Sequence, residues 1–409
     1  MKGIVLTIDD LKQIKPVKNY LEQHNWLNKS KKIEKSNGFT LIYTTLQQLD
    51  GFLQKFSYKY YEYETIKNDF ESRVRQYLID TNLYHESIII PKKYSIYPPL
   101  ILFSNWFNID IDEKLYRFIL DVISDISNQK LTHIALNQPI IKSDIMRRPF
   151  NITPLFGDFG PHPSDQVWDN PQQSDFDNAF WCHVTQNGIY QTWSPKFTMF
   201  SRGNIKEKNR VLTQLKNINQ SIVFDLYCGI GYFSLSYLKA GAQELFGWEL
   251  NPWSIEGFIR GLNGNHFTNF KVFTTSDEFN YEIYINLKLN GIKIFLFQEN
   301  NQNALSRLST FPENSLNISH VNLGLLPSSQ PSWPLAQQIV KSYNYQKYPQ
   351  IHIHENVHIN QFELFQKQIL NEFKNGKILH LEKVKTFAPD VWHIVVDLEL
   401  ETSDVSTID

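Results

Sequence analysis

Two glycines in the segment FDLYCGIGYFSL, residues 224–235, mark the strongest candidate for chemistry in this sequence. Gly229 and Gly231 have no Cβ, so a turn built on them can be tight and can bring the backbone close to a ligand. A helix is expected to follow, and its first N–H groups and dipole favour polar ligand groups. Glu249 lies further on in GWELNP, where a carboxylate can accept hydrogen bonds from both hydroxyls of a ribose. The combination indicates a site for a nucleoside-containing cofactor.

The acid ahead of the turn separates this pattern from a dinucleotide-binding motif. The order is D-x-x-x-G-x-G, and Ser234 stands where G-x-G-x-x-G would place its third glycine. The pattern resembles the first motif of class I S-adenosylmethionine-dependent transferases. In such a motif, Asp225 would orient the loop or the amino-acid end of the cofactor. The alternative is that Asp225 caps an ordinary tight turn.

Alternating strands and helices must position these residues. A short apolar run at residues 222–226 predicts the first strand, and further strands are expected at residues 244–250, 292–297, 318–323, 350–355 and 392–400. Helical patterns follow the first two runs, at residues 232–239 and 252–262. Strands that alternate with helices indicate an α/β domain with a mainly parallel sheet.

Three regions are expected along the chain. They are an α+β N-terminal region of unknown role (1–145), a small β-rich module (146–203) and a Rossmann-like, class I S-adenosylmethionine-binding catalytic domain (204–409). The middle region is assigned from its many turn formers and short aromatic runs. Outside the catalytic sheet, a strand is expected at 39–45 and helices at 16–26, 113–127 and 204–217.

The composition is that of an ordinary globular protein. With 42% hydrophobic residues, the 409-residue chain can bury two or three separate cores. Its two cysteines, Cys182 and Cys228, predict neither a disulfide framework nor a cysteine zinc site. No apolar stretch reaches the roughly 18 residues of a membrane span, and acids interrupt the N-terminal segment before a secretory core could form. We expect a protein of the reducing cytoplasm without membrane association.

The formal net charge of −2 does not by itself indicate a nucleic-acid partner. Basic residues are nevertheless concentrated between residues 191 and 216: Lys196, Arg202, Lys206, Lys208, Arg210 and Lys216. After Lys385 the sequence contains acids but no Lys or Arg. A local positive patch would suit contacts with phosphates, whereas an ordinary solvated helix face would carry the same charges.

Six segments occur in an order that is specific to one family. They are TMFSRGNIKEKNR (198–210), DLYCGIGYF (225–233), WELNPWS (248–254), VNLGLLPSS (321–329), IHIHENV (351–357) and VKTFAPDVWHIVVDLE (384–399). Together they resemble the eukaryotic, fungal-like tRNA wybutosine-synthesising aminocarboxypropyltransferases, which are related to the tRNA guanine-N1 methyltransferases. The resemblance covers residues 146–400. It implies transfer of the 3-amino-3-carboxypropyl group of S-adenosylmethionine to C7 of 4-demethylwyosine, next to the anticodon of tRNA-Phe, with release of methylthioadenosine.

The resemblance also implies a cofactor site. Its residues would be Ser201, Arg202, Lys208, Asp225, Gly229, Gly231, Glu249, Asn251, Glu299 and Asn300. Glu249 would hold the ribose, and Glu299 and Asn300 would contact the adenine edge, because a carboxylate accepts from an amine and an amide can read the ring. The interval from Glu249 to Glu299 is longer than the family pattern. It predicts an insertion near residues 268–293 and leaves the register of Asn300 and Asn301 open.

A loop after the strand at 318–323 would decide which group is transferred. Related methyltransferases carry an Asn-Leu-Pro turn there, beside the target base, whereas Gly324 replaces that proline in NLGLLPSS. Asn322, Pro327 and Ser328 are therefore candidates for positioning the substrates, and a strand-to-loop exit is the alternative. The sequence identifies no catalytic base.

Three polar residues late in the chain could suggest a metal site. Alternation would place His352 and His354 on one face of a strand and Glu355 on the other. A third ligand is not apparent in the sequence, and the implied chemistry needs no metal. His352, His354 and Glu355 are therefore expected to pack and to form hydrogen bonds rather than to bind a metal.

A tRNA is the expected partner, and a monomer is the expected state. Phosphate contacts are assigned to Arg147, Arg148, Lys196, Lys206 and Arg210. Bases of an anticodon loop can be splayed out and stacked on aromatic side chains, for which candidates near the motifs are Tyr227, Tyr232, Phe233, Trp253 and Trp333. Each of these could instead belong to the core. A tRNA guanine-N1 methyltransferase and a non-catalytic tRNA-binding scaffold remain as alternatives.

Overall fold

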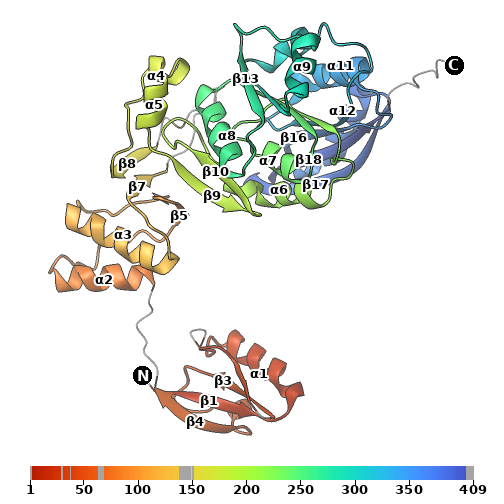
Figure 1. Ribbon diagram of the computed structural model, residues 1–409. Coiled ribbons are helices and arrows are strands. Elements are labelled where there is room, and N and C mark those ends of the chain that lie inside the picture. Colours follow the sequence, from red (N-terminus) through yellow and green to blue (C-terminus); the bar gives the residue numbers. More distant parts are fainter. Residues whose placement is uncertain are drawn as a thin grey trace. The chain divides into compact units, whose positions relative to one another are not determined.

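The computed structural model describes residues 2–28, 31–36, 38–62, 69–137, 149 and 152–401 (Figure 1). The chain divides into two compact units, Met1–Glu86 and Ser87–Asp409. Within the described ranges, every helix is too short or too polar to cross a membrane.

An antiparallel sheet in the order β2-β3-β1-β4 forms the centre of the first unit. The elements of this unit are β1 (Lys2–Ile8), α1 (Leu11–Gln23), β2 (Glu34–Ser36), β3 (Phe39–Tyr43), η1 (Gly51–Leu53), β4 (Ser57–Glu62) and α2 (Phe70–Asp80). Helix α1 shares one apolar core with the sheet through Val17 and Leu21. It begins before the predicted start at residue 16, because Asp10 caps it by accepting a hydrogen bond from the Lys12 N–H at 2.9 Å.

The second unit begins with a small sheet in the order β5-β6-β7-β8, followed by a hairpin of β9 and β10. Its elements are β5 (Tyr94–Tyr97), β6 (Leu100–Phe103), α3 (Glu113–Ser127), β7 (His133–Leu136), β8 (Thr153–Phe156), α4 (Asp165–Asp169), α5 (Gln173–Asn178), β9 (Cys182–Gln186) and β10 (Ile189–Trp193). Helix α3 has the predicted bounds, and Asp112 caps its first turn. Strand β8 pairs with β7 across the predicted boundary at residue 145, so the sheet does not follow that boundary.

The C-terminal half is built on an eight-stranded sheet in the order β13-β14-β12-β11-β15-β16-β18-β17. Its strands are β11 (Ile222–Asp225), β12 (Glu244–Glu249), β13 (Phe270–Thr274), β14 (Ile294–Gln298), β15 (Ile318–Leu323), β16 (Gln350–His358), β17 (Gly376–Ala388) and β18 (Val391–Leu400). Neighbours from β13 to β16 are parallel, whereas β18 pairs antiparallel with both β16 and β17. The sheet is therefore mainly parallel, as the sequence pattern predicted.

Helices cover both faces of this sheet (Figure 1). They are η2 (Arg202–Asn204), α6 (Ile205–Thr213), α7 (Ser234–Lys239), α8 (Pro252–Gly264), α9 (Tyr281–Leu289), η3 (Asn301–Asn303), α10 (Ala304–Arg307), η4 (Gln330–Ser332), α11 (Trp333–Tyr343), η5 (Ile359–Gln361) and α12 (Phe362–Glu372). Phe224 of β11 belongs to an apolar core with α11 and α12, whereas its neighbour Val223 belongs to a core with α7 and α8. Successive strand residues point to opposite faces, so the sheet is buried on both sides.

The parallel strands bring several predicted site residues to one edge of the sheet. Asp225 and Glu249 end β11 and β12, and Glu299 follows the last residue of β14. Because the carboxyl ends of parallel strands meet at one edge, the loops that follow them surround a common space. Residues 268–293, where an insertion was predicted, form edge strand β13 and helix α9.

Candidate functional site

A cavity of about 520 Å³ opens at this edge of the sheet, within the size range of small-molecule sites. Its walls come from the loops after β11, β12, β14 and β15, from the segment before α6 and from β17. The predicted cofactor residues that line it are Ser201, Gly229, Glu249, Asn251, Glu299 and Asn300. The predicted residues Arg202, Lys208, Asp225 and Gly231 lie outside its wall.

Glu249 is held in one orientation by backbone groups at the cavity wall. Its Oε2 accepts a hydrogen bond from the Gly229 N–H at 3.0 Å, and its Oε1 accepts one from the Asn251 N–H at 2.8 Å. Burial raises the pKa of this carboxyl to about 7, although the two hydrogen bonds oppose the shift. Each carboxylate oxygen has a further lone pair, so both can also accept from ribose hydroxyls.

The two glycines of the turn have different roles. Gly229 has φ +54°, lines the cavity, and would place a Cβ 2.8 Å from the Tyr232 ring. Gly231 has φ +82°, and a Cβ there would lie 2.5 Å from the Phe258 ring of α8. Gly229 therefore opens the turn toward the cavity, whereas Gly231 allows helix α8 to pack closely against it.

Asp225 lies behind the loop and is fully buried. Its Oδ2 accepts a hydrogen bond from the Ser234 hydroxyl at 2.6 Å, and its Oδ1 accepts one from the Asn322 amide at 3.0 Å. Burial raises the pKa of this carboxyl. Asp225 thus orients the loop and the first turn of α7, which is one of the two motif roles considered for it.

Residues 299–301, which follow β14, line the cavity, but the carboxylate of Glu299 already has a partner. Glu299 accepts two hydrogen bonds from Arg307, from Nε at 3.0 Å and from Nη2 at 2.7 Å. Both amides whose register was open line the cavity. Asn301 is buried and donates to the Leu226 carbonyl at 2.8 Å, whereas Asn300 is exposed. Asn300 is therefore the more accessible of the two to a ligand.

Lys208 was predicted to line the cofactor site, but it lies behind the aromatic residues near the cavity. Its Nζ donates to the side-chain oxygens of Gln186 at 3.1 Å and Gln191 at 2.6 Å. It also lies 4.5 Å from the centre of the Phe200 ring. Burial lowers the pKa of this amine to about 7.

Lys385 of β17 lies in the cavity wall instead. Its Nζ donates to the Ser201 hydroxyl at 2.6 Å, and burial lowers its pKa. The sequence gave one indication that Lys385 could be functional, because it lies in VKTFAPD, one of the segments that resemble the family. No role was assigned to it because strand β17 was not predicted. Phe387 follows on the same face of the strand and also lines the cavity.

The NLGLLPSS loop contributes its middle to the cavity. Residues 324–326 line it, whereas Asn322 is buried beneath the loop and Pro327 and Ser328 lie beyond the wall. Ser328 pairs with Glu355 of β16 through an isolated antiparallel bridge. Burial raises the pKa of Glu355 to about 7. The loop is therefore tied at its far end to strand β16.

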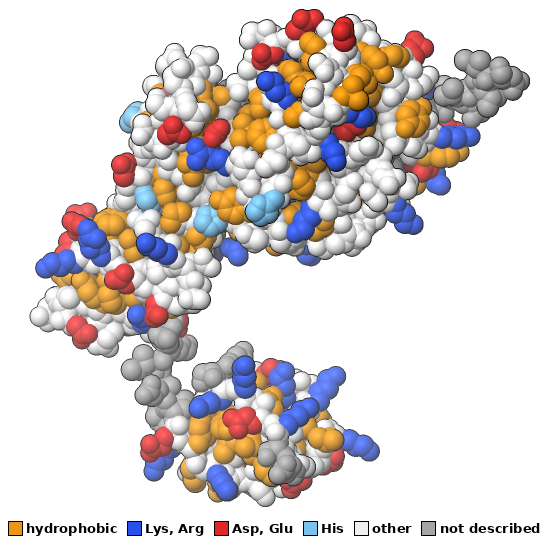
Figure 2. All heavy atoms as spheres, in the orientation of Figure 1, with side chains coloured by type: hydrophobic (Ala, Val, Ile, Leu, Met, Phe, Trp, Pro, Cys, Tyr) orange, Lys and Arg blue, Asp and Glu red, His pale blue; other side chains and the backbone are white. Residues whose placement is uncertain are grey.

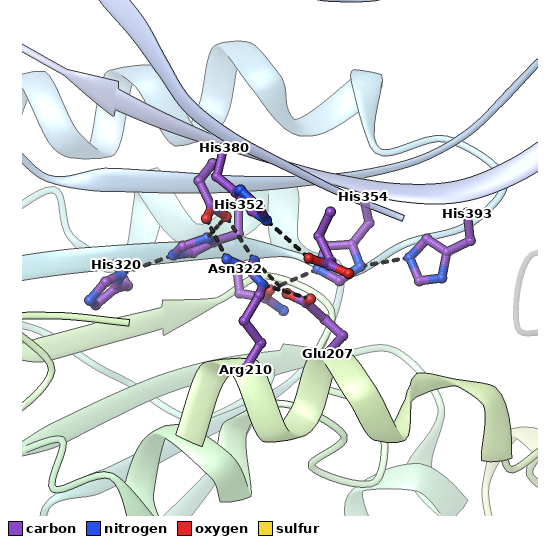
Figure 3. A network of polar contacts seen from close by, with 10 residues as sticks. Glu207, Arg210, His320, Asn322, His352, His354, His380 and His393 are labelled. Atoms are coloured by element: carbon purple, nitrogen blue, oxygen red, sulfur yellow. Dashed lines mark hydrogen bonds and ion pairs between the residues drawn. The ribbon is translucent and has the colours of Figure 1, made fainter. Parts of the chain in front are cut away.

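A buried polar network lies next to this loop (Figure 3). His352 contacts His320 at 2.9 Å through Nε2 and Asp397 at 2.7 Å through Nδ1. His354 contacts the Asn322 side-chain oxygen at 3.2 Å. The predicted hydrogen-bonding role of His352 and His354 is confirmed, and Asn322 acts inside this network rather than in the cavity.

Arg210 was predicted to contact tRNA phosphates, but the residue is only 6% exposed and its guanidinium is held inside the protein. Its guanidinium donates to Glu207 at 2.7 and 2.8 Å and to Asp397 at 2.5 and 2.9 Å. Figure 3 shows Glu207 and Arg210 pointing from α6 toward the strand histidines. A charge survives burial only when it is paired, and the two acids supply that pairing.

The other basic residues differ in exposure. Lys206 and Arg202 are exposed, whereas Lys196 is half-buried and donates to two backbone carbonyl oxygens. Arg147 and Arg148 lie outside the described residues. On the face seen in Figure 2, basic side chains are scattered among acidic ones. Only some of the basic residues concentrated between residues 191 and 216 therefore contribute positive charge to the surface.

The aromatic side chains considered for stacking also separate into two groups. Tyr227, Tyr232 and Phe233 line the cavity. Trp253 and Trp333 are buried in the apolar cores. Of these five aromatic residues, the three that line the cavity remain candidates for stacking on a base.

Comparison with known proteins identifies the family. A model of the TRM5/TYW2 methyltransferase domain matches residues 183–287. A Saccharomyces cerevisiae relative, "tRNA wybutosine-synthesizing protein 2", is 38% identical over 397 residues, covering 82% of this chain and 81% of the relative. The chain belongs to this family. The resemblance inferred from the six segments is thereby confirmed, and so is the prediction of a transferase.

A further relative agrees with this assignment, and a solved structure shares the fold. The Schizosaccharomyces pombe protein of the same name is 38% identical over 342 residues, covering 79% of this chain and 76% of that protein. A crystal structure of P. horikoshii TYW2 in complex with MeSAdo has a TM-score of 0.51 and 19% identity, over 81% of this chain and 99% of that chain. The predicted class I S-adenosylmethionine-dependent transferase fold is confirmed.

Proposed function

We propose that this chain transfers the 3-amino-3-carboxypropyl group of S-adenosylmethionine to C7 of 4-demethylwyosine, next to the anticodon of tRNA-Phe. The observation that carries the proposal is the half-buried, oriented Glu249 in a cavity of a chain of the wybutosine-synthesizing protein 2 family. MeSAdo in the P. horikoshii structure supports it, because methylthioadenosine is the nucleoside that this transfer releases.

The cavity residues suit a donor with a nucleoside at one end and an amino acid at the other. Glu249 would accept from the ribose hydroxyls, and Asn300 would contact the adenine edge. Ser201 and Lys385 are joined at 2.6 Å and present a hydroxyl and an amine. This pair would bind the carboxylate of the methionine arm, since charge-assisted hydrogen bonds are the stronger ones.

When bound, S-adenosylmethionine supplies a sulfonium leaving group with three carbons open to attack. In the proposed transfer, C7 forms a bond to the γ-carbon, the bond between sulfur and the γ-carbon breaks with both electrons on sulfur, and the proton of C7 passes to water. The chain contributes mainly alignment, which decides the carbon that reacts. Residues 324–326 and the pair of Ser201 and Lys385 are placed to hold the methionine arm in this way.

In this proposal, Lys206 and Arg202 contact the tRNA backbone, because both are exposed.

A role in the cytoplasm is consistent with the buried, unpaired thiols of Cys182 and Cys228.

Product analysis tests the proposal. The protein is incubated with S-adenosylmethionine and tRNA-Phe bearing 4-demethylwyosine, and both products are identified by mass spectrometry. We expect methylthioadenosine and a base enlarged by the aminocarboxypropyl group. A label on the methionine carboxyl carbon should enter the tRNA, and a label on the methyl group should leave with the nucleoside.

Two other outcomes would contradict the proposal. S-adenosylhomocysteine together with methyl label in the tRNA would establish a methyltransferase. Binding of both substrates without either product would support a non-catalytic scaffold.

A further inference from the structure

A chain of hydrogen bonds crosses one face of the catalytic sheet, and Figure 3 shows its histidine end. It joins His393 of β18 to His354 of β16 at 3.0 Å, His354 to Asn322 of β15 at 3.2 Å, and Asn322 to Asp225 of β11 at 3.0 Å. The four strands are neighbours in the sheet, and each of these side chains is at most 1% exposed. The chain ends at the acid that orients the glycine loop.

The direction of each hydrogen bond follows from the chemistry of the groups. Asp225 accepts from the Ser234 hydroxyl and from the Asn322 amide nitrogen, which leaves the Asn322 carbonyl oxygen facing His354. A carbonyl oxygen only accepts, so His354 donates from Nε2. Burial lowers the pKa of His354, and a neutral imidazole carries one N–H. Its Nδ1 therefore accepts from His393.

The chain begins beside the donor cavity. His393 lies opposite Lys385 in the pairing of β18 with β17, and residues opposite each other share a face of the sheet. Burial and the charge of Lys385 lower the pKa of His393 to about 3. The Nδ1 atom of His393 is buried without a hydrogen-bond partner among the described residues. Burying such an acceptor costs free energy, so stability alone does not account for the chain.

Asn322 supports the loop that borders the donor cavity. It is the residue before the last of β15, and residues 324–326 of the following loop line the cavity. A Cβ at Gly324 would lie 3.1 Å from the Asn322 amide nitrogen, so the backbone of the loop packs directly on this side chain. The orientation of Asn322 therefore determines how the loop leaves the strand.

His354 also supports an aromatic residue of the cavity wall. Its ring centre lies 4.8 Å from that of Phe233, which lines the donor cavity. A Cβ at Gly324 would lie 3.5 Å from the same Phe233 ring. Phe233, Gly324 and Asn322 thus pack together, and His354, which does not line the cavity, contacts this group from behind.

We propose that His354 is a positioning residue for the transfer: it holds Asn322 and Phe233, and through them the loop at residues 324–326 that keeps the reacting carbon of the donor in line with the acceptor. This inference rests on the proposed function, in which that carbon is the γ-carbon. His354 touches neither substrate. It acts on alignment, to which the rate of a transfer is sensitive.

The far end of the loop does not depend on the His354 side chain. The backbone N–H of Asn356 donates to the Pro327 carbonyl at 2.9 Å, and the Ser329 hydroxyl donates to the backbone carbonyl of His354 at 3.0 Å. Both contacts use the backbone of β16, so they survive a side-chain replacement at position 354. Such a replacement should loosen only the start of the loop.

Two substitutions of His354 isolate its hydrogen bond to Asn322. His354→Gln has a side chain long enough to place an N–H near the position of Nε2, so it can still donate to Asn322. His354→Asn reaches only the position of Nδ1, so it can contact His393 but not Asn322. Both variants lose the ring that packs on Phe233. The difference between them therefore reports the contact with Asn322.

The test measures the kcat for release of the nucleoside product from S-adenosylmethionine, with tRNA-Phe bearing 4-demethylwyosine as acceptor. His354→Asn should lower kcat by about tenfold, the effect of one buried hydrogen bond. The Kd for S-adenosylmethionine, measured by calorimetry, should change little, because the contacts of Glu249 and Lys385 remain. His354→Gln should recover most of the lost kcat.

A double-mutant cycle gives a second measurement. Asn322→Ala should also lower kcat, and adding His354→Asn to it should cost little more, because both act through one contact. His320→Asn is the matched control, since His320 is a buried histidine of the same strand whose hydrogen bonds go to His352 and to the Lys216 carbonyl. It should keep the unaltered kcat. All rates are compared below the lowest melting temperature of the set.

The inference is overturned if folded His354→Asn keeps the unaltered kcat, if His354→Gln loses as much as His354→Asn, or if the two effects in the cycle simply add. An equal loss of affinity for S-adenosylmethionine would also overturn it. Failure of the proposed function appears instead in the identity of the nucleoside. Release of S-adenosylhomocysteine would refute transfer of the γ-carbon, and the same variants would still decide whether His354 positions the carbon that reacts.

Discussion

Replacing Glu249 by glutamine tests the centre of the donor site. The carboxylate accepts from two backbone donors, the N–H groups of Gly229 and Asn251, at 3.0 and 2.8 Å. A glutamine has one acceptor oxygen, so its NH₂ group must face one of these donors or rotate away. The side chain would then lose the orientation that lets it accept from both ribose hydroxyls.

The expected loss follows from the strength of these hydrogen bonds. Removing a charged acceptor costs about 1–3 kcal/mol, which corresponds to a roughly 5- to 150-fold weaker dissociation constant for S-adenosylmethionine. The pH dependence gives a second measure. Burial raises the pKa of Glu249 to about 7, and only the ionised form accepts from both hydroxyls. Cofactor affinity should therefore fall as pH drops through 7, by about tenfold from pH 8 to pH 6.

Calorimetric titration with S-adenosylmethionine at pH 6, 7 and 8 measures both effects. Glu249→Gln should be weaker at pH 8 and should show a flat profile. Glu244→Gln is the matched control, because Glu244 is a buried acid at the other end of the same strand, bonded to Tyr284 at 2.7 Å. Unchanged affinity in folded Glu249→Gln, or a pH dependence that persists in it, would refute the assignment of the ribose to Glu249.

Three further predictions follow from the placement of the basic residues. Arg210→Met should lower the free energy of unfolding in urea by about 3–5 kcal/mol, because it leaves Glu207 buried without a cation and Asp397 with His352 as its remaining side-chain partner; an unchanged midpoint would contradict the buried ion pairs. Lys206→Glu should flatten the salt dependence of tRNA binding by about one slope unit, and an unchanged slope would remove it from the interface. Lys385→Met should weaken S-adenosylmethionine binding by about tenfold, while an unaffected titration would exclude contact with the carboxylate.

The strands and helices that hold the donor site were largely predictable from the sequence. The strand at Ile318–Leu323 and the helix at Glu113–Ser127 have the predicted bounds, and the helix is marked by its periodic apolar residues and by the capping acid Asp112. Strand β17 was missed because its residues are mostly half-buried or exposed and carry many charges. Such a pattern is typical of an edge strand and gives little hydrophobic signal.

The errors in the site arise from side-chain direction, which the sequence does not fix. Lys208 and Arg210 both follow the exposed Lys206 on helix α6, yet they point inward to amide and carboxylate partners. Asp397, the acid that binds Arg210, lies far away in the chain on β18. Whether a run of basic residues forms a surface patch can be decided only when the distant acids that pair with its buried members are known.

The parallel strands and the antiparallel hairpin contribute different walls to the cavity that the proposed donor would occupy. The parallel strands end at the loops that contain most of the proposed donor-binding residues, and backbone N–H groups hold the Glu249 carboxylate in one orientation there. Strands β17 and β18 follow each other without a helix between them, and β17 contributes Lys385 and Phe387 to the same cavity. In the proposed function, changes at Glu249 should therefore act on the ribose of the donor, and changes at Lys385 on its methionine arm. Residues 324–326 follow the parallel strand β15 and complete this cavity wall beside the hairpin, so in the proposed function they are placed to influence which carbon of the donor is transferred.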